Sequence, residues 1–239
     1  MQKSIEAIVE FQFIPSEPWD ITIPGLLYEK VRNDFPKKRE QVSYVAEFKA
    51  KNGSTLEPNV NLQQRIRFIR SNRSALLQIS RDLFTVNHFK PYPTWKKFKL
   101  IIQKNLRIYL EIAKPKGFKR LGLRYINKFQ FKERRIETKD YFKYYPEIPE
   151  KMIPKSLAGF GCRVEISYQE ERDRLLLSSG TTFPDKPFKL ASILDLDYIM
   201  LKSEGISIEE FSHWLEHAHT VVEDAFEACL TDRCKNLFE

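Results

Sequence analysis

The feature that most constrains the fold is a series of stretches in which apolar and polar residues alternate, joined by short connections. In the first stretch, Ala7, Val9, Phe11 and Phe13 would share one face. Similar stretches occur at 42–48, 64–70, 75–79, 83–89, 120–131, 162–169, 174–180 and 191–201. Most connections between them are too short for the crossovers that parallel strands need. The sequence therefore predicts an α+β protein with a mostly antiparallel sheet or sheets.

Two helices are expected among the first strands. One follows Thr22, with Pro24 in its first turn, and stops at Phe35 before a proline. The other follows Thr94 as its N-cap and runs to about Ala113, because apolar residues recur there at helical spacing.

A third, long helix closes the chain. Ser207 and Glu210 match a capping box, in which each side chain accepts a hydrogen bond from the other residue's main-chain N–H. Apolar residues then recur at helical spacing as far as Cys229, and acidic residues occupy the opposite side. The predicted fold thus has three main helices, of which the last is long and C-terminal.

A Pro- and Tyr-rich stretch at 133–159 is the best candidate for a domain boundary. It contains Pro146, Pro149 and Pro154 and is predicted to be irregular. The chain would then consist of a basic α+β lobe (1–132), a crossover (133–159) and a three-stranded lobe with the acidic helix (160–239). A single continuous domain is the alternative.

Charge is distributed unevenly along the chain. The first 144 residues contain 30 of the 40 Lys and Arg but only 14 of the 32 Asp and Glu. A basic field attracts polyanions, whereas an acidic flank repels them or folds back to neutralise it. The N-terminal part is therefore expected to contact nucleic acid or an acidic protein, and a second copy of the chain is a further candidate partner.

Cations on the second helix form a stripe opposite its apolar side: Lys96, Lys97, Lys104 and Arg107. A row of cations about one turn apart can follow phosphate groups. Neighbouring strands add Arg65, Arg67 and Arg124. A solvated basic surface is the commoner meaning of such a pattern, but the positive excess in this part of the chain favours a polyanion ligand.

Aromatic residues alternate with cations just before this helix. Exposed Tyr92 or Trp95 could stack on the bases of a single strand. In the alternative reading, a rigid Pro-Tyr-Pro turn uses the two rings to attach the helix to the sheet.

Asp195 and Asp197 provide the main alternative to a binding function. Strand alternation puts both on one face, close enough to share a divalent cation in a metal-dependent hydrolase or nuclease. No motif supplies a third ligand, and pairing with cross-strand Arg or Lys is the simpler expectation. His213 and His217 match a zinc-protease pattern, but the helical wheel puts both on the polar side. No nucleophile or phosphate-loop motif is evident, so no cofactor or catalytic residue is predicted.

Composition indicates a folded, soluble protein of the cytoplasm. Hydrophobic residues make up 42% of the 239 residues, enough for a large core. The three cysteines form no even set and are best explained as reduced thiols. The chain shows no signal peptide and no apolar run of about 18 residues, so no membrane association is expected.

Several motifs together resemble a known family. They are Pro18-Trp19-Asp20 with Ile23-Pro24-Gly25-Leu26-Leu27-Tyr28, Asn87-His88 before Pro91-Tyr92-Pro93, Leu121-Gly122-Leu123-Arg124-Tyr125-Ile126-Asn127, Leu194-Asp195-Leu196-Asp197-Tyr198 and Phe226-Glu227-Ala228-Cys229-Leu230-Thr231-Asp232. From near residue 6 to its end, the chain is similar to a sporadically distributed family of uncharacterised prokaryotic proteins of this length. The resemblance implies no particular site residues. The patchy distribution of the family implies mobile or defence-associated genes, including toxin–antitoxin-like pairs.

The sequence therefore predicts a non-catalytic binding protein whose basic N-terminal lobe contacts nucleic acid or an acidic protein, in a defence or toxin–antitoxin-like system. A hydrolase built around Asp195 and Asp197 is the alternative. In a third reading, the acidic helix only covers the protein's own basic lobe.

Overall fold

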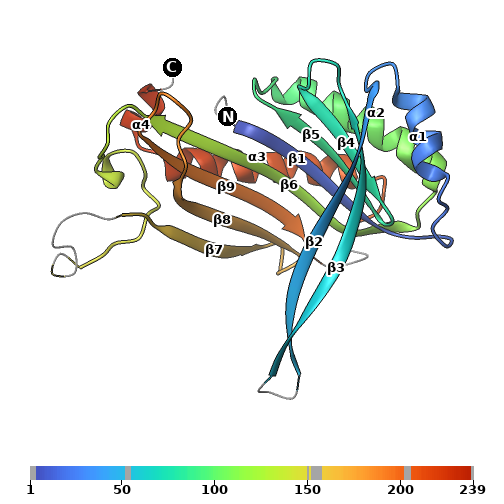
Figure 1. Cartoon of the computed structure of the whole chain (residues 1–239), viewed down its shortest axis with the longest axis horizontal. Helices are drawn as coiled ribbons and strands as arrows, with labels where there is room; N and C mark the ends of the chain where they lie inside the picture. Colours follow the sequence, from blue (N-terminus) through green and yellow to red (C-terminus); the bar gives the residue numbers. More distant parts are fainter. Residues whose placement is uncertain (1–3, 52–54, 150, 152–157, 202–205, 238–239) are drawn as a thin grey trace.

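The structure, a computed structural model, describes residues 4–51, 55–149, 151, 158–201 and 206–237. Nine strands form one antiparallel sheet in the order β2-β3-β4-β5-β1-β6-β9-β8-β7 (Figure 1). The predicted α+β class and antiparallel pairing are confirmed. The strands are β1 (Ser4–Ile14), β2 (Lys37–Lys51), β3 (Thr55–Ile69), β4 (Ala75–Ser80), β5 (Leu83–Phe89), β6 (Gly117–Phe131), β7 (Gly161–Tyr168), β8 (Asp173–Thr182) and β9 (Leu190–Met200).

Helices α1 (Ile23–Val31), α2 (Trp95–Ala113) and α3 (Phe211–Cys229) pack on one face of the sheet, which we call the helix face (Figure 1). Alternation along β1 explains the packing, because Phe11 and Phe13 both point to this face and are buried. The ring of Phe11 contacts Phe211 of α3 at 5.1 Å between centroids, and Phe13 stacks on Tyr109 of α2 at 4.7 Å. The alternate residues of each strand point to the opposite face, which we call the polar face.

The topology divides the chain into two halves that share part of their arrangement. In each half the first strand pairs with the last, β1 with β5 and β6 with β9, and a 19-residue helix follows the last strand. The two first strands, β1 and β6, pair antiparallel and join the halves into one sheet. Among the described residues, the first half also contains α1 and a fifth strand, so the likeness between the halves is partial.

The sheet also joins the two lobes expected from the sequence. β6 precedes the stretch 133–159 and β9 follows it, and the two strands pair directly along Leu121–Phe131 and Leu190–Met200. The described part of that stretch contains one short 3-10 helix, η1 (Thr138–Asp140). Strands of both lobes therefore share a single sheet.

The second and third strands are much longer than alternation predicted. β3 pairs with β4 only over Ile66–Ile69, so the rest of β3 pairs with β2 alone. The two strands, which we call the ribbon, extend well beyond the body of the sheet (Figure 1). Residues 37–41 are polar and lie in β2, the edge strand of the sheet, where residues 37–40 are exposed and no buried side imposes apolar alternation.

The predicted helix ends are confirmed in part. Ser207 N donates to Glu210 Oε2 over 2.8 Å and Glu210 N donates to Ser207 Oγ over 3.3 Å, so the two hydrogen bonds of the predicted box are present. They lie in the turn before α3, however, because the helix begins at Phe211 and its N-cap is Glu210 rather than Ser207. Thr22 and Thr94 occupy N-cap positions, but their side chains accept no capping hydrogen bond. α1 ends at Val31 rather than at 35, and a short helix, α4 (Asp232–Asn236), follows α3. Among the described residues, no helix has the length and apolar character that a membrane crossing requires.

Candidate nucleic-acid interface

The structure separates the predicted cations onto two sides of the molecule. Strand register places Arg65, Arg67 and Arg124 on the polar face of the sheet. Lys96 and Lys97 are exposed on α2, which lies on the helix face. The stripe on α2 and the strand arginines therefore belong to two different surfaces.

On the polar face, cations gather where the ribbon leaves the sheet. Arg39 of β2 lies directly opposite Arg67 of β3, and Arg65 is the next residue of β3 on the same face. Lys37 lies beyond them and donates to the main-chain oxygen of Ser71 over 2.9 Å. We call Lys37, Arg39, Arg65 and Arg67 the ribbon base.

Like charges face one another in the ribbon base. Directly opposed like charges destabilise an antiparallel pair, so this arrangement costs folding free energy. Arg67 Nε donates to Gln78 Oε1 over 2.8 Å, a neutral partner. Burial, and then repulsion from Arg65, lowers the pKa of Arg67. Among the described residues Arg39 has no ion-pair partner within 4.0 Å.

A surface hollow of about 610 Å³ lies beside the ribbon base. Arg65 lines it together with Arg81, from the turn between β4 and β5, and Lys119 of β6. Trp19, which is half-buried, forms part of the wall, and Asp82 is the one carboxylate among the residues that line the hollow. Ile66, Ile79 and Pro24 also line it, so the hollow reaches toward the helix face, and Arg65 is the residue that it shares with the ribbon base.

Local contacts neutralise part of the stripe on α2. The ammonium of Lys104 lies 2.5 Å from Asp34, and Arg107 pairs with Glu111 over 3.4 Å. Among the described residues no ion pair involves Lys96 or Lys97. Two of the four predicted cations on this helix thus have an anionic partner within the protein.

The two predicted stacking aromatics pack inside the protein. The hydroxyl groups of Tyr92 and Tyr125 lie 2.8 Å apart. Trp95 stacks on His219 of α3 with ring centroids 3.9 Å apart, and its Nε1 donates to Glu216 Oε2 over 2.9 Å. Both rings therefore attach α2 to its neighbours, as in the alternative reading of the sequence.

His219 is a buried polar residue that the sequence reasoning missed. Its Nδ1 lies 3.5 Å from the Tyr125 hydroxyl and its Nε2 lies 3.8 Å from Glu223. Burial lowers the pKa of His219, so its neutral form is favoured in the folded protein. Its position one turn after the buried Leu215 could have indicated burial, but histidine was not counted in the apolar pattern.

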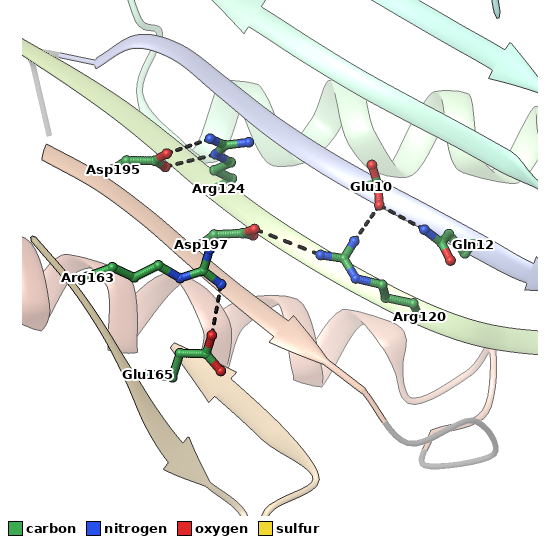
Figure 2. Close-up of polar contacts among 8 residues, drawn as sticks. All are labelled: Glu10, Gln12, Arg120, Arg124, Arg163, Glu165, Asp195 and Asp197. Atoms are coloured by element: carbon green, nitrogen blue, oxygen red, sulfur yellow. Dashed lines mark hydrogen bonds and ion pairs between the residues drawn. The ribbon is translucent and has the colours of Figure 1, made fainter. Parts of the chain in front are cut away.

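Asp195 and Asp197 lie on the polar face, and both are near arginines of β6 (Figure 2). Asp195 accepts from Nε of Arg124 over 2.8 Å and from Nη2 of the same guanidinium, so both of its oxygens are occupied. Asp197 lies 3.8 Å from Arg120, which also pairs with Glu10. The expected cross-strand pairing is thus present.

The surroundings of Asp197 disfavour its charged form. Burial raises the pKa of Asp197 to about 6, and the nearby arginines oppose this rise only in part. Its contact with Arg120 is at 3.8 Å, whereas Asp195 is held by two nitrogens of one guanidinium.

No group of three or more His, Cys, Asp or Glu side chains among the described residues has the spacing of a metal site. Of the two histidines in the zinc-like pattern, His213 is exposed, and His217 Nε2 lies 3.2 Å from the side-chain amide of Gln169.

Comparison with known proteins adds little to this geometry. No known protein family matches the chain, and no curated protein does. One solved structure that was found is the crystal structure of the di-domain ARO/CYC BexL from the BE-7585A biosynthetic pathway. It is 11% identical, and the alignment covers 91% of this chain and 95% of that one, with a TM-score of 0.21.

Proposed function

We propose that this protein binds nucleic acid without catalysis, and that the ribbon base is its contact surface. The observation that carries the proposal is the position of Arg39 directly opposite Arg67, with Arg65 beside them. Phosphate groups placed along this cluster would relieve the repulsion that the fold leaves in place.

The shape of the ribbon supports the same ligand. A two-stranded β-ribbon fits the major groove of B-form DNA, which is about 12 Å wide. The cations at its base, with Arg81 and Lys119 in the adjacent hollow, would then lie beside the phosphates that border the groove. Binding of this kind is mainly electrostatic and falls steeply as salt concentration rises.

Two reversals of equal charge test which surface binds. Arg39→Glu with Arg65→Glu changes the ribbon base, and Lys96→Glu with Lys97→Glu changes α2 by the same amount. Affinity for fluorescent duplex DNA, single-stranded DNA and RNA is measured by anisotropy over a salt series. The ribbon variant should bind at least about tenfold more weakly, with a slope of log K against log salt shallower by about two, whereas the α2 variant should stay close to wild type.

Other results of these measurements would favour another contact surface or another function. Loss of binding only in the α2 variant would make the helix stripe the interface. If wild type binds polyglutamate but no nucleic acid, the partner is an acidic protein. Divalent-metal-dependent cleavage of the DNA that is lost in Asp195→Asn would favour the hydrolase alternative.

A further inference from the structure

One end of the sheet is an exposed edge strand, β7. It pairs with β8 on one side and is the last strand in the sheet order. Most of its residues are exposed, including Val164 and Ile166, which are 40% and 41% exposed and whose side chains point to the helix face. Long exposed edges with apolar side chains favour pairing with another strand.

The main-chain groups available at this edge follow from the hydrogen bonds to β8. Thr181 N donates to Phe160 O over 3.0 Å, in register with the pairing of Gly161 with Gly180. Because main-chain groups in an antiparallel strand point alternately to either side, Gly161, Arg163, Glu165 and Ser167 direct theirs away from β8. These residues are therefore positioned to bond another strand.

We propose that β7 pairs antiparallel with β7 of a second copy of this chain, about a two-fold axis at Val164. In such a pair, residues directly opposite one another lie on the same face. An axis at Arg163 or Glu165 would put identical charges opposite one another. An axis at Val164 puts Arg163 opposite Glu165 of the second copy, and this favourable contact occurs twice.

The same register also gives apolar contacts on the helix face and hydrogen bonds between the two main chains. On the helix face it places Val164 opposite its own equivalent and Ile166 opposite Cys162, so the exposed apolar groups form one continuous strip. The residues whose N–H and C=O groups point outward then bond one another, Arg163 with Glu165 and Gly161 with Ser167. The result would be one sheet that continues through both protomers.

The charges needed for this contact are already oriented along the edge. Arg163 Nη2 lies 2.9 Å from Glu165 Oε1 within β7 (Figure 2), and Glu165 also lies 3.4 Å from Arg174 of β8. Both side chains of the Arg163–Glu165 pair are about half exposed, so they can exchange partners with little desolvation.

Charge reversal and its compensation test the register. Mass is measured by light scattering and sedimentation for the full chain from about 1 to about 300 µM. Wild type should be dimeric. Arg163→Glu or Glu165→Arg alone puts like charges opposite one another and should raise the dimer dissociation constant at least about tenfold. The double swap, which combines both substitutions, should return this constant to the wild-type value. Arg174→Gln, which removes the contact of Glu165 with β8 but keeps the charges of β7, should stay dimeric.

A disulfide gives an independent measure of the same geometry. Ile166→Cys places a thiol opposite Cys162 of the second copy in a pair without direct main-chain bonds, where the Cα separation of about 4.5 Å permits a disulfide. Mild oxidation should yield a covalent dimer that reducing agent reverses. The native Cys229 and Cys234 are buried, and burial raises the pKa of the Cys229 thiol to about 11, so they should not react. A wild-type monomer at every concentration, or failure of the double swap to restore the dimer, would overturn the proposal.

Discussion

At the scale of single residues, Asp195 and Asp197 show how two neighbouring carboxylates on one strand acquire different roles. Asp195 is held at both oxygens by one guanidinium, whereas Asp197 lies at a distance of 3.8 Å from its nearest arginine. We therefore expect opposite consequences when either is replaced by Asn.

Asp195→Asn should lower the melting temperature at neutral pH, because Arg124 loses half of a bidentate contact. Asp197→Asn should behave differently. In the folded state the pKa of the Asp197 carboxyl is raised from its ordinary value to about 6. As pH rises from that ordinary value to 6 and above, ionisation of Asp197 therefore destabilises the folded protein progressively, by at most about 3 kcal/mol.

The measurement is the difference in melting temperature between Asp197→Asn and wild type, taken at pH 4.5 and pH 7.5. The difference should become more favourable to the variant at the higher pH. A constant difference would mean that Asp197 is ionised throughout this range.

A second prediction concerns His219. Burial lowers the pKa of His219 in the folded protein. Below about pH 6.5 this histidine is therefore protonated more readily in the unfolded chain than in the folded one, and the stability of the fold should fall between pH 7.5 and pH 5.5. His219→Phe keeps a ring against Trp95 and removes the titrating group, so its loss of melting temperature over this interval should be smaller than in wild type. The exposed His213 supplies the control: His213→Phe should retain the wild-type loss.

At the scale of secondary structure, the local signals in the sequence identified most elements. Alternation located 83–89 with its observed bounds, and the hydrogen bonds expected between Ser207 and Glu210 are present in the turn that leads into α3. The ribbon was underestimated because its first residues are polar on both faces. The placement of the cations on two surfaces depended on pairing between distant strands, and no local pattern contains that information.

Helix α3 has the apolar side that helical spacing predicted, and Phe226 belongs to it. This residue is buried and stacks on Phe129 of β6 with ring centroids 6.4 Å apart. Phe226→Ala should lower the free energy of unfolding by about 3 to 5 kcal/mol in urea titrations, because it removes a large core side chain and leaves a cavity. Asp224→Ala, on the exposed side of the same helix, should change it by less than about 0.5 kcal/mol.

At the scale of the whole molecule, β1 and β6 form the seam between the two halves of the sheet. Ten residue pairs cross this seam, from Ser4 with Asn127 to Ile14 with Gly117. Because the same strands supply the core of both halves, the chain should unfold in a single cooperative transition.

Tryptophan positions allow this to be tested. Trp19 belongs to the first half and Trp214 to the second, whereas Trp95 contacts α3 across the two halves. Urea unfolding of a variant with Phe at both 95 and 214, followed by the fluorescence of Trp19, reports the first half, and a variant with Phe at both 19 and 95 reports the second. In each variant the fluorescence midpoint should coincide with the midpoint from circular dichroism, which follows both halves. Separated midpoints would show that each half unfolds by itself.

The central position of β1 also has a consequence during synthesis. β1 is synthesised before both of its partners: β5 is complete by residue 89, but β6 begins only at residue 117. At translation rates of about 5 to 20 residues per second, the nascent chain exposes one edge of an apolar strand for seconds before β6 emerges. Chaperones that bind extended apolar segments would find their target at this stage of translation rather than in the finished protein.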